Sequence, residues 1–312
     1  MRAVVVRRFG GPEVLELVEV PVPEPGPGQV RVRVAAAGVN PVDAVTRAGV
    51  LAQAGLMAPR KTVGIGWDVA GTVERLGPGV SGFAVGDAVI GLRDRLDVPL
   101  GAYADALVLD AAALAPAPPG VPAVAAATLP LNGLTAVQAL DLLDLPAGAT
   151  LLVTGAAGAV GGFAVQLAAR RGLRVVATAD ERDAAALREL GAEWHVPRGA
   201  ADPAAEVRAL VPGGVDGALD TALLGVAALG AVRNRGSFVA VSAGAAPPGL
   251  RGIRVAHVWV AADGAALAGL AALAAHGELA LRVADTLPLE HAGSAHRRLA
   301  RGGLRGRLVL VP

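Results

Sequence analysis

The chain has 312 residues, enough for two domains of ordinary size, and its formal net charge is +1. So small a charge provides no global field for nucleic acid or for an anionic membrane, and neither is an expected partner. Because the sequence contains no cysteine, disulfides, thiolate nucleophiles and cysteine-ligated zinc are excluded.

Residues 1–118 are rich in short β-like segments separated by glycine and proline, which is typical of a partly closed barrel. Neither a secretory signal nor a membrane-spanning helix is predicted, so the cytoplasm is the expected location. The expected strands are Arg2–Arg8, Leu15–Val20, Gln29–Ala37, Asp68–Leu76, Ala88–Leu92 and Ala102–Leu109.

After a proline-rich segment near Ala115–Pro122, helical and strand patterns alternate, which predicts a parallel sheet covered on both faces over residues 119–261. The expected strands begin at Leu151 and then cover Arg174–Thr178, Trp194–Val196, Gly217–Thr221, Ser237–Ser242 and Arg254–Val260. The expected helices are Thr128–Leu143, one ending at Arg171, Glu181–Leu190, Pro203–Val211 and Ala222–Asn234.

Residues 262–312 do not extend this alternation, and we expect them to return to the first domain. Their expected elements are a helix over Gly264–His276, a β-like stretch at Asp285–Leu287, a helix over Leu289–Arg301 and a strand over Gly306–Val311.

The most informative local pattern is a buried strand from Leu151, a tight glycine turn, and an apolar helix. Small residues at such a turn let the backbone approach a pyrophosphate, and the N-terminus of the new helix favours negative charge. The strand Arg174–Thr178 closes a βαβ unit of suitable length. A glycine-rich turn without a ligand is the structural alternative. The expected dinucleotide contacts are Gly155, Ala156, Gly158, Ala159, Val160, Gly161 and Thr178.

Four blocks in register resemble the medium-chain dehydrogenase/reductase superfamily, in its zinc-independent quinone oxidoreductase (ζ-crystallin-like) branch. These blocks are Ala36–Gly49, Gly66–Val89, Leu129–Ala168 and His296–Pro312. The resemblance implies an α/β protein with a Rossmann doubly wound parallel sheet (119–261) and a β-rich, GroES-like, partly open barrel domain (1–118 and 262–312).

Zinc-dependent relatives carry a cysteine just after the AGVN position, where this chain has Asn40 and Pro41, and a histidine–glutamate pair where it has Trp67 and Asp68. The resemblance therefore implies that catalytic zinc has no ligands here. All five histidines lie beyond residue 190, and surface or capping roles are expected for them.

The same resemblance implies roles for side chains near the nicotinamide. Asn40 is expected to face the nicotinamide or the acceptor, where its amide could donate to a developing oxyanion. The alternative for Asn40 is a turn residue before Pro41. Thr135 is expected to reach the nicotinamide side or a phosphate, and Val241 and Ser242 are expected to line the nicotinamide pocket.

NADP(H) is the favoured cofactor, because the branch mostly uses NADPH and because Arg182 and Arg198 could pair with a 2′-phosphate. NAD(H) stays open, since Asp180 lies 19 residues after Gly161, where an acid would bind a ribose 2′-hydroxyl and repel a phosphate.

The expected function is a metal-free, NADPH-dependent reductase that transfers hydride to a small-molecule quinone or α,β-unsaturated carbonyl. Two alternatives stay open: a cofactor-binding sensor or structural protein with little turnover, and an enoyl-thioester reductase. The resemblance also implies a homodimer, in which the edge strand of the nucleotide-binding sheet pairs across a two-fold axis, and Arg254–Val260 is apolar enough to be that strand.

Overall fold

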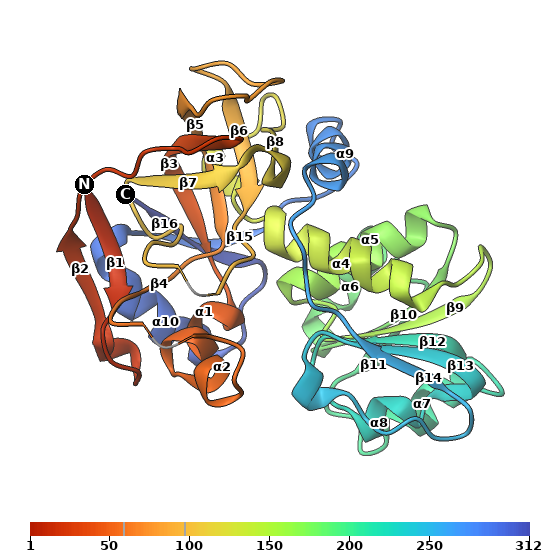
Figure 1. Ribbon diagram of the computed structural model, residues 1–312. Helices are drawn as coiled ribbons and strands as arrows, with labels where there is room; N and C mark the ends of the chain where they lie inside the picture. Colours follow the sequence, from red (N-terminus) through yellow and green to blue (C-terminus); the bar gives the residue numbers. More distant parts are fainter. Residues whose placement is uncertain (59, 97) are drawn as a thin grey trace. The chain divides into compact units, whose positions relative to one another are not determined.

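The computed structural model describes residues 1–58, 60–96 and 98–312 and divides into two compact units (Figure 1). Unit 1 comprises Met1–Leu131 and Ala261–Pro312, and unit 2 comprises Asn132–Val260. Unit 1 extends past the expected boundary at residue 118 because helix α3 (Ala123–Ala126) packs on strands of its sheet.

Unit 1 is built mainly from antiparallel strands. Its larger sheet has the order β15-β16-β3-β5-β6-β8, with β7 also paired to β3, and its smaller sheet has the order β2-β1-β4. The one parallel pair in these sheets, over the described residues, is β15 with β16. The strands are β1 (Arg2–Val6), β2 (Leu15–Glu19), β3 (Gln29–Val39), β4 (Val63–Gly64), β5 (Asp68–Leu76), β6 (Ala88–Leu92), β7 (Ala106–Asp110), β8 (Leu114–Pro116), β15 (Val283–Pro288) and β16 (Arg307–Val311).

Short helices connect these strands and cover their core. Residues 262–312 belong to unit 1, where β16 pairs antiparallel with β3 through Leu308↔Val39. The helices of unit 1 are η1 (Pro12–Val14), α1 (Pro41–Arg47), α2 (Val50–Gln53), η2 (Ala111–Ala113), α3, α9 (Gly264–Ala275), η5 (Leu289–His291) and α10 (Ala292–Arg301). Helix α4 (Pro130–Leu143) starts in unit 1 and continues in unit 2.

Unit 2 is a six-stranded parallel sheet in the order β11-β10-β9-β12-β13-β14. Within this unit, α4, α5 and α6 lie over one face of the sheet, while α7 and α8 lie against the other (Figure 1). The strands are β9 (Thr150–Thr154), β10 (Arg174–Ala179), β11 (Trp194–Pro197), β12 (Val215–Asp220), β13 (Val232–Ala240) and β14 (Arg254–His257). The remaining helices are α5 (Ala159–Arg170), η3 (Glu181–Asp183), α6 (Ala184–Glu189), α7 (Pro203–Leu210), α8 (Val226–Leu229) and η4 (Ala243–Ala245).

The largest error in the expected elements of unit 2 concerns Ala222–Asn234. Only Val226–Leu229 is helical, and the strand β13 already begins at Val232. The backbone of Leu223 and Gly225 has positive φ angles of 59° and 57°, which prevents a helix from starting at Ala222. The apolar, alanine-rich composition of this segment hid both features.

One helical stretch, Ala123–Leu143, is long and apolar enough to cross a membrane by length and composition, contrary to our expectation. Most of it is buried inside the fold, and core helices of globular proteins pass the same test.

Candidate functional site

The glycine turn of unit 2 lies where β9 ends and α5 begins. Gly155 has a φ of 61°, and Gly158 is the N-cap of α5. A Cβ atom at Gly161 would lie 2.4 Å from the Gly155 carbonyl oxygen and 2.8 Å from Ala156 Cα, so only glycine lets the helix pack this closely. The first N–H groups of a helix, here those of Ala159 and Gly161 among others, have no acceptor within the helix and point toward its N-terminal side.

Two of the expected dinucleotide contacts instead hold the turn in place. Ala156 is fully buried, and its N–H donates to the Thr178 carbonyl oxygen at 3.0 Å. The Thr178 hydroxyl is also buried and accepts from the Gly155 N–H at 3.4 Å. Ala156 and Thr178 therefore attach the turn to β10, while Val160 lies half-buried in the first turn of α5.

Asp180, which follows β10, forms ion pairs with Arg182 and Arg198. From these three residues we predicted the choice of cofactor. Asp180 is the N-cap of η3, and its carboxylate lies 3.4 Å from Arg182 Nε and 3.2 Å from Arg198 Nη2. Both arginine side chains are about two-thirds exposed. Asp180 thus pairs with the same two guanidinium groups that we expected to bind a 2′-phosphate.

The other expected nicotinamide contacts of unit 2 differ in exposure. Val241 is half-buried and Ser242 is exposed, and both follow β13 at the carboxyl edge of the sheet. Thr135 lies on α4 and is only 5% exposed. Ser242 is therefore reachable by a ligand, whereas Thr135 offers little surface.

In unit 1, Asn40 is a buried cap of helix α1. Its backbone N–H donates to Asp43 Oδ2 at 2.7 Å, and its side chain and that of Asp43 form a reciprocal capping box. Its amide nitrogen donates to Asp68 Oδ2 at 2.6 Å, and the residue has no exposed surface. Asn40 therefore caps helix α1, a structural role close to that of the turn residue named as the alternative, and its amide already donates to a carboxylate.

Asp43 lies at the centre of a buried polar chain. It accepts from the Gly66 N–H at 3.1 Å and from the Tyr103 hydroxyl at 3.0 Å, in addition to Asn40. Burial raises the pKa of Asp43 to about 7, against the lowering effect of these hydrogen bonds.

The same chain continues to a histidine for which we expected a surface or capping role. His296 is fully buried, and its Nε2 lies 3.3 Å from the Tyr103 hydroxyl and its Nδ1 3.1 Å from Arg47 Nη1. Burial, and secondarily the charge of Arg47, lowers the pKa of His296 to about 3. The ring is neutral, so Nδ1 accepts from Arg47 and Nε2–H donates to Tyr103, whose hydroxyl donates to Asp43. The position of His296 near the chain end gave no sequence signal for this contact.

Asp68 lies in a second buried position, close to where α4 begins. Its carboxylate accepts from the Leu131 N–H at 2.5 Å and from Asn40. A Cβ at Gly38 would come within 2.5 Å of Asp68 Oδ2, so residue 38 must be glycine for the carboxylate to fit. Burial raises the pKa of Asp68 to about 6, and the nearby buried Arg307 opposes this rise.

Comparisons with known proteins agree with this arrangement. Residues 26–119 match the alcohol dehydrogenase GroES-like domain, and residues 190–310 match the family described as zinc-binding dehydrogenase. A solved NAD-dependent alcohol dehydrogenase is 33% identical, with a TM-score of 0.87 and coverage of 100% of both chains. The chain belongs to the medium-chain dehydrogenase/reductase family.

Two further relatives of this medium-chain dehydrogenase/reductase bear on its activity. The chloroplast envelope quinone oxidoreductase homolog of Arabidopsis thaliana is 38% identical over 206 residues, which cover 62% of this chain and 60% of that protein. The match thus spans less than two thirds of that relative. A mycobacterial protein solved in complex with NADPH is 29% identical, with a TM-score of 0.84 over 100% of both chains. The family is one of oxidoreductases that bind nicotinamide cofactors.

One of the two families that this dehydrogenase/reductase matches is described as zinc-binding, and a shared metal site would need a group of ligand side chains. Over residues 1–58, 60–96 and 98–312, no three His, Cys, Asp or Glu side chains are grouped as metal ligands would be. Asn40, Trp67 and Asp68 lie where the zinc-dependent pattern has its ligands, and Trp67 is buried. Of these residue types only aspartate commonly binds zinc, and the Asp68 carboxylate already accepts from the Leu131 N–H and from the Asn40 amide, so the three residues do not fit a catalytic zinc.

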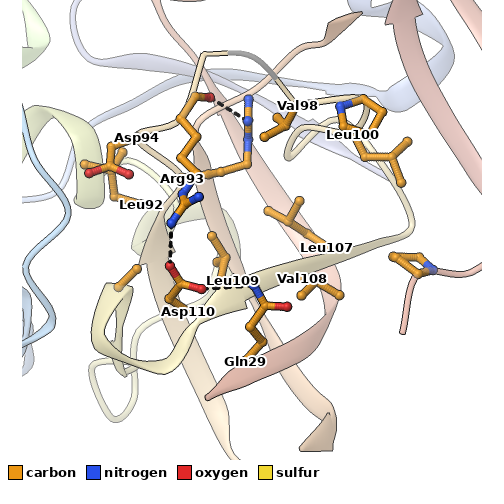
Figure 2. Close-up of a pocket in the computed structure, with 14 residues that line it drawn as sticks. Gln29, Leu92, Arg93, Asp94, Val98, Leu100, Leu107, Val108, Leu109 and Asp110 are labelled. Atoms are coloured by element: carbon orange, nitrogen blue, oxygen red, sulfur yellow. Dashed lines mark hydrogen bonds and ion pairs between the residues drawn. The ribbon is translucent and has the colours of Figure 1, made fainter. Parts of the chain in front are cut away.

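Unit 1 of this dehydrogenase/reductase also contains a pocket of about 250 Å³ beside β7, which none of the expected site residues lines (Figure 2). Its floor is apolar, with Leu92, Leu107 and Leu109. Asp110 at its rim accepts from Gln29 at 3.0 Å and lies 3.2 Å from Arg95 Nη2. Gln29, Asp110 and Arg95 are thus engaged with one another, so the pocket does not identify a ligand.

Proposed function

We propose that this protein is an NADPH-dependent reductase that transfers hydride to a small quinone or α,β-unsaturated carbonyl without a metal ion. The observation that carries this proposal is the glycine turn, where α5 begins so close to Gly155 that only glycine fits at position 161. A helix N-terminus that follows such a turn is a common site for a pyrophosphate. The relative complexed with NADPH and the relative named for quinones support the cofactor and the acceptor class.

The cofactor would supply the hydride, and the chain would supply binding and orientation. The first turn of α5 would hold the pyrophosphate through backbone N–H groups, and Ser242 would lie near the nicotinamide side. The buried side chains of unit 1, including Asn40 and Asp43, would stabilise the fold of unit 1 without contacting the reacting atoms, because they have no exposed surface.

The preference for NADPH would depend on Asp180, Arg182 and Arg198. A 2′-phosphate could take over both guanidinium groups from Asp180, since exposed ion pairs of this kind contribute little stability. Asp180 would oppose that exchange by repulsion, so we expect measurable activity with NADH as well. Replacing Asp180 by serine should increase the preference for NADPH.

The test is NADPH and NADH oxidation, followed by absorbance, with a panel of quinones and enones. We expect kcat/KM with NADPH to exceed that with NADH by roughly tenfold, and Arg198→Ala to remove most of this preference. Arg188→Ala, an exposed arginine on α6, is the matched control and should change nothing. A large preference for NADH would contradict the cofactor proposal, and tight NADPH binding without turnover would support the sensor alternative.

We also propose a homodimer in which the edge strand β14 of unit 2 pairs with a second copy. β14 is the last strand of the sheet, and Trp259 just after it is half exposed. Light scattering at micromolar concentration should give the mass of two chains, and a monomer would contradict the proposal.

A further inference from the structure

A loop of exposed apolar side chains adjoins the glycine turn in unit 2. This loop, residues 221–226, follows β12, and Leu223, Leu224 and Val226 are 56%, 39% and 60% exposed. A Cβ at Gly155 would lie 2.9 Å from Thr221 Oγ1 and 3.2 Å from Ala222 Cβ, so the loop packs directly against the turn.

Buried polar groups fix the position of this loop. The Thr154 hydroxyl donates to Asp220 Oδ1 at 2.6 Å and accepts from the Ala222 N–H at 3.0 Å. Asp220 Oδ2 accepts from the Gly225 N–H at 2.8 Å, and the Thr221 hydroxyl donates to the Thr154 carbonyl oxygen at 2.6 Å. Both Thr154 and Asp220 are fully buried, so the exposed side chains are carried on a rigid base.

The backbone of the loop is strained at Leu223, whose φ is 59°. A leucine pays a steric penalty in this region that glycine and asparagine largely avoid. Such strain persists only where the surrounding structure imposes it, and it concentrates at ligand clamps and active sites. Here the strain accompanies an apolar side chain that is held out in solvent.

The strand order shows which part of a dinucleotide this loop would meet. From β9 the chain moves to β10 and β11 on one side, and from β12 it moves to β13 and β14 on the other. The switch point therefore lies between β9 and β12, flanked by the glycine turn and by the loop. Asp180 follows β10 on the adenosine side, so the loop lies on the opposite, nicotinamide side.

We propose that Leu223, Leu224 and Val226 form an apolar clamp on the nicotinamide riboside half of the bound dinucleotide. This inference rests on the proposed function. The clamp holds the ring end of the cofactor by burying these side chains against it, and it is already formed before the cofactor binds. The three residues are positioning residues, because they orient the cofactor and take no part in bond making.

The experiment compares two ligands, NADPH and adenosine 2′,5′-bisphosphate, which has the adenosine half but no nicotinamide. The variants are Leu223→Asn, which suits the positive φ and removes the apolar side chain, and Leu224→Ala. Leu210→Ala is the matched control, because Leu210 and Leu224 have the same exposed fraction of 39%. Leu210 ends helix α7, which comes before β12 in the chain, whereas the loop follows β12.

We expect the double variant Leu223→Asn/Leu224→Ala to bind NADPH about five- to tenfold more weakly, with unchanged affinity for adenosine 2′,5′-bisphosphate. The control should bind both ligands as the unchanged protein does. If the double variant melts early, Leu223→Gly is used in its place, because glycine relieves the strain at this position.

Equal weakening of both ligands would overturn the clamp, and so would unchanged binding of NADPH. A change of mass by light scattering in the variants would also overturn it, since the patch would then be a contact between two copies. If the unchanged protein binds neither NADPH nor NADH, the proposed function itself fails. Tight binding by the unchanged protein with unaffected variants defeats the clamp alone.

Discussion

Each unit contains one cluster of polar side chains that we singled out, and the two clusters differ in burial. Unit 1 buries Asn40, Asp43, Tyr103 and His296 in one chain of hydrogen bonds, where each group has a partner inside the unit. Unit 2 keeps Asp180 and its arginines at the surface, beside a turn whose geometry depends on glycine.

This difference indicates which side chains are available to bind a ligand. Buried, mutually paired groups specify a fold but offer nothing to a ligand, whereas exposed donors at a helix N-terminus and a strand edge can bind one. We therefore expect substitutions in the chain of unit 1 to affect stability, and substitutions around the turn of unit 2 to affect cofactor binding.

The largest effect should come from removing the carboxylate of Asp43. Asp43→Ala leaves the Asn40 and Gly66 N–H groups and the Tyr103 hydroxyl buried without their acceptor, and we expect it to lower the free energy of unfolding by about 3–5 kcal/mol. Chemical denaturation measures this. Glu16→Ala, which breaks an exposed ion pair, should cost less than ~1 kcal/mol. Similar losses in the two variants would contradict the structural role of Asp43.

Gly161→Ala should have the next largest effect, and on binding more than on stability. The added Cβ would push α5 away from Gly155 and displace the N–H groups that face the pyrophosphate. We expect NADPH affinity to fall roughly 100-fold, measured by fluorescence titration. Gly269→Ala, where a Cβ meets no atom within 4 Å, serves as the control and should bind NADPH normally. Normal binding by Gly161→Ala would show that the turn is not the phosphate site.

A smaller effect should appear in the dependence of stability on pH. The folded-state pKa values of Asp43 and Asp68 are raised to about 7 and about 6, above the ordinary value near 4, so the folded protein binds more protons in this window. Their stabilising contribution is complete below about pH 4 and is lost as the pH rises through 6 to 7.

The lowered pKa of His296 acts in the opposite sense below about pH 6.5, because a folded protein that keeps this ring neutral gains stability as the pH rises. The net result should be a fall in melting temperature of a few degrees between about pH 5 and pH 8, as followed by circular dichroism. Asp43→Asn should make this slope shallower, whatever its melting temperature at one pH. A slope that is unchanged in Asp43→Asn would mean that Asp43 does not titrate in this window.

The sequence was most informative where a pattern depends on local geometry. Strand, turn and helix at Leu151–Ala168 were predicted because glycine spacing reflects the packing of α5 on the turn itself. The bonds of His296 to Tyr103 and Arg47 join positions far apart in the chain, and no local pattern encodes them. For the same reason the burial of Asn40 against Asp68 was not foreseen, although both residues had been singled out.

The proposed reaction needs the cofactor site of unit 2 and no metal ion. The most direct test compares the rate of NADPH oxidation by a quinone before and after exhaustive chelation. Metal analysis of the same sample accompanies the rate measurement. We predict that the chelated protein holds no stoichiometric zinc and retains its full rate. Loss of activity on chelation, with recovery on adding zinc, would contradict the account.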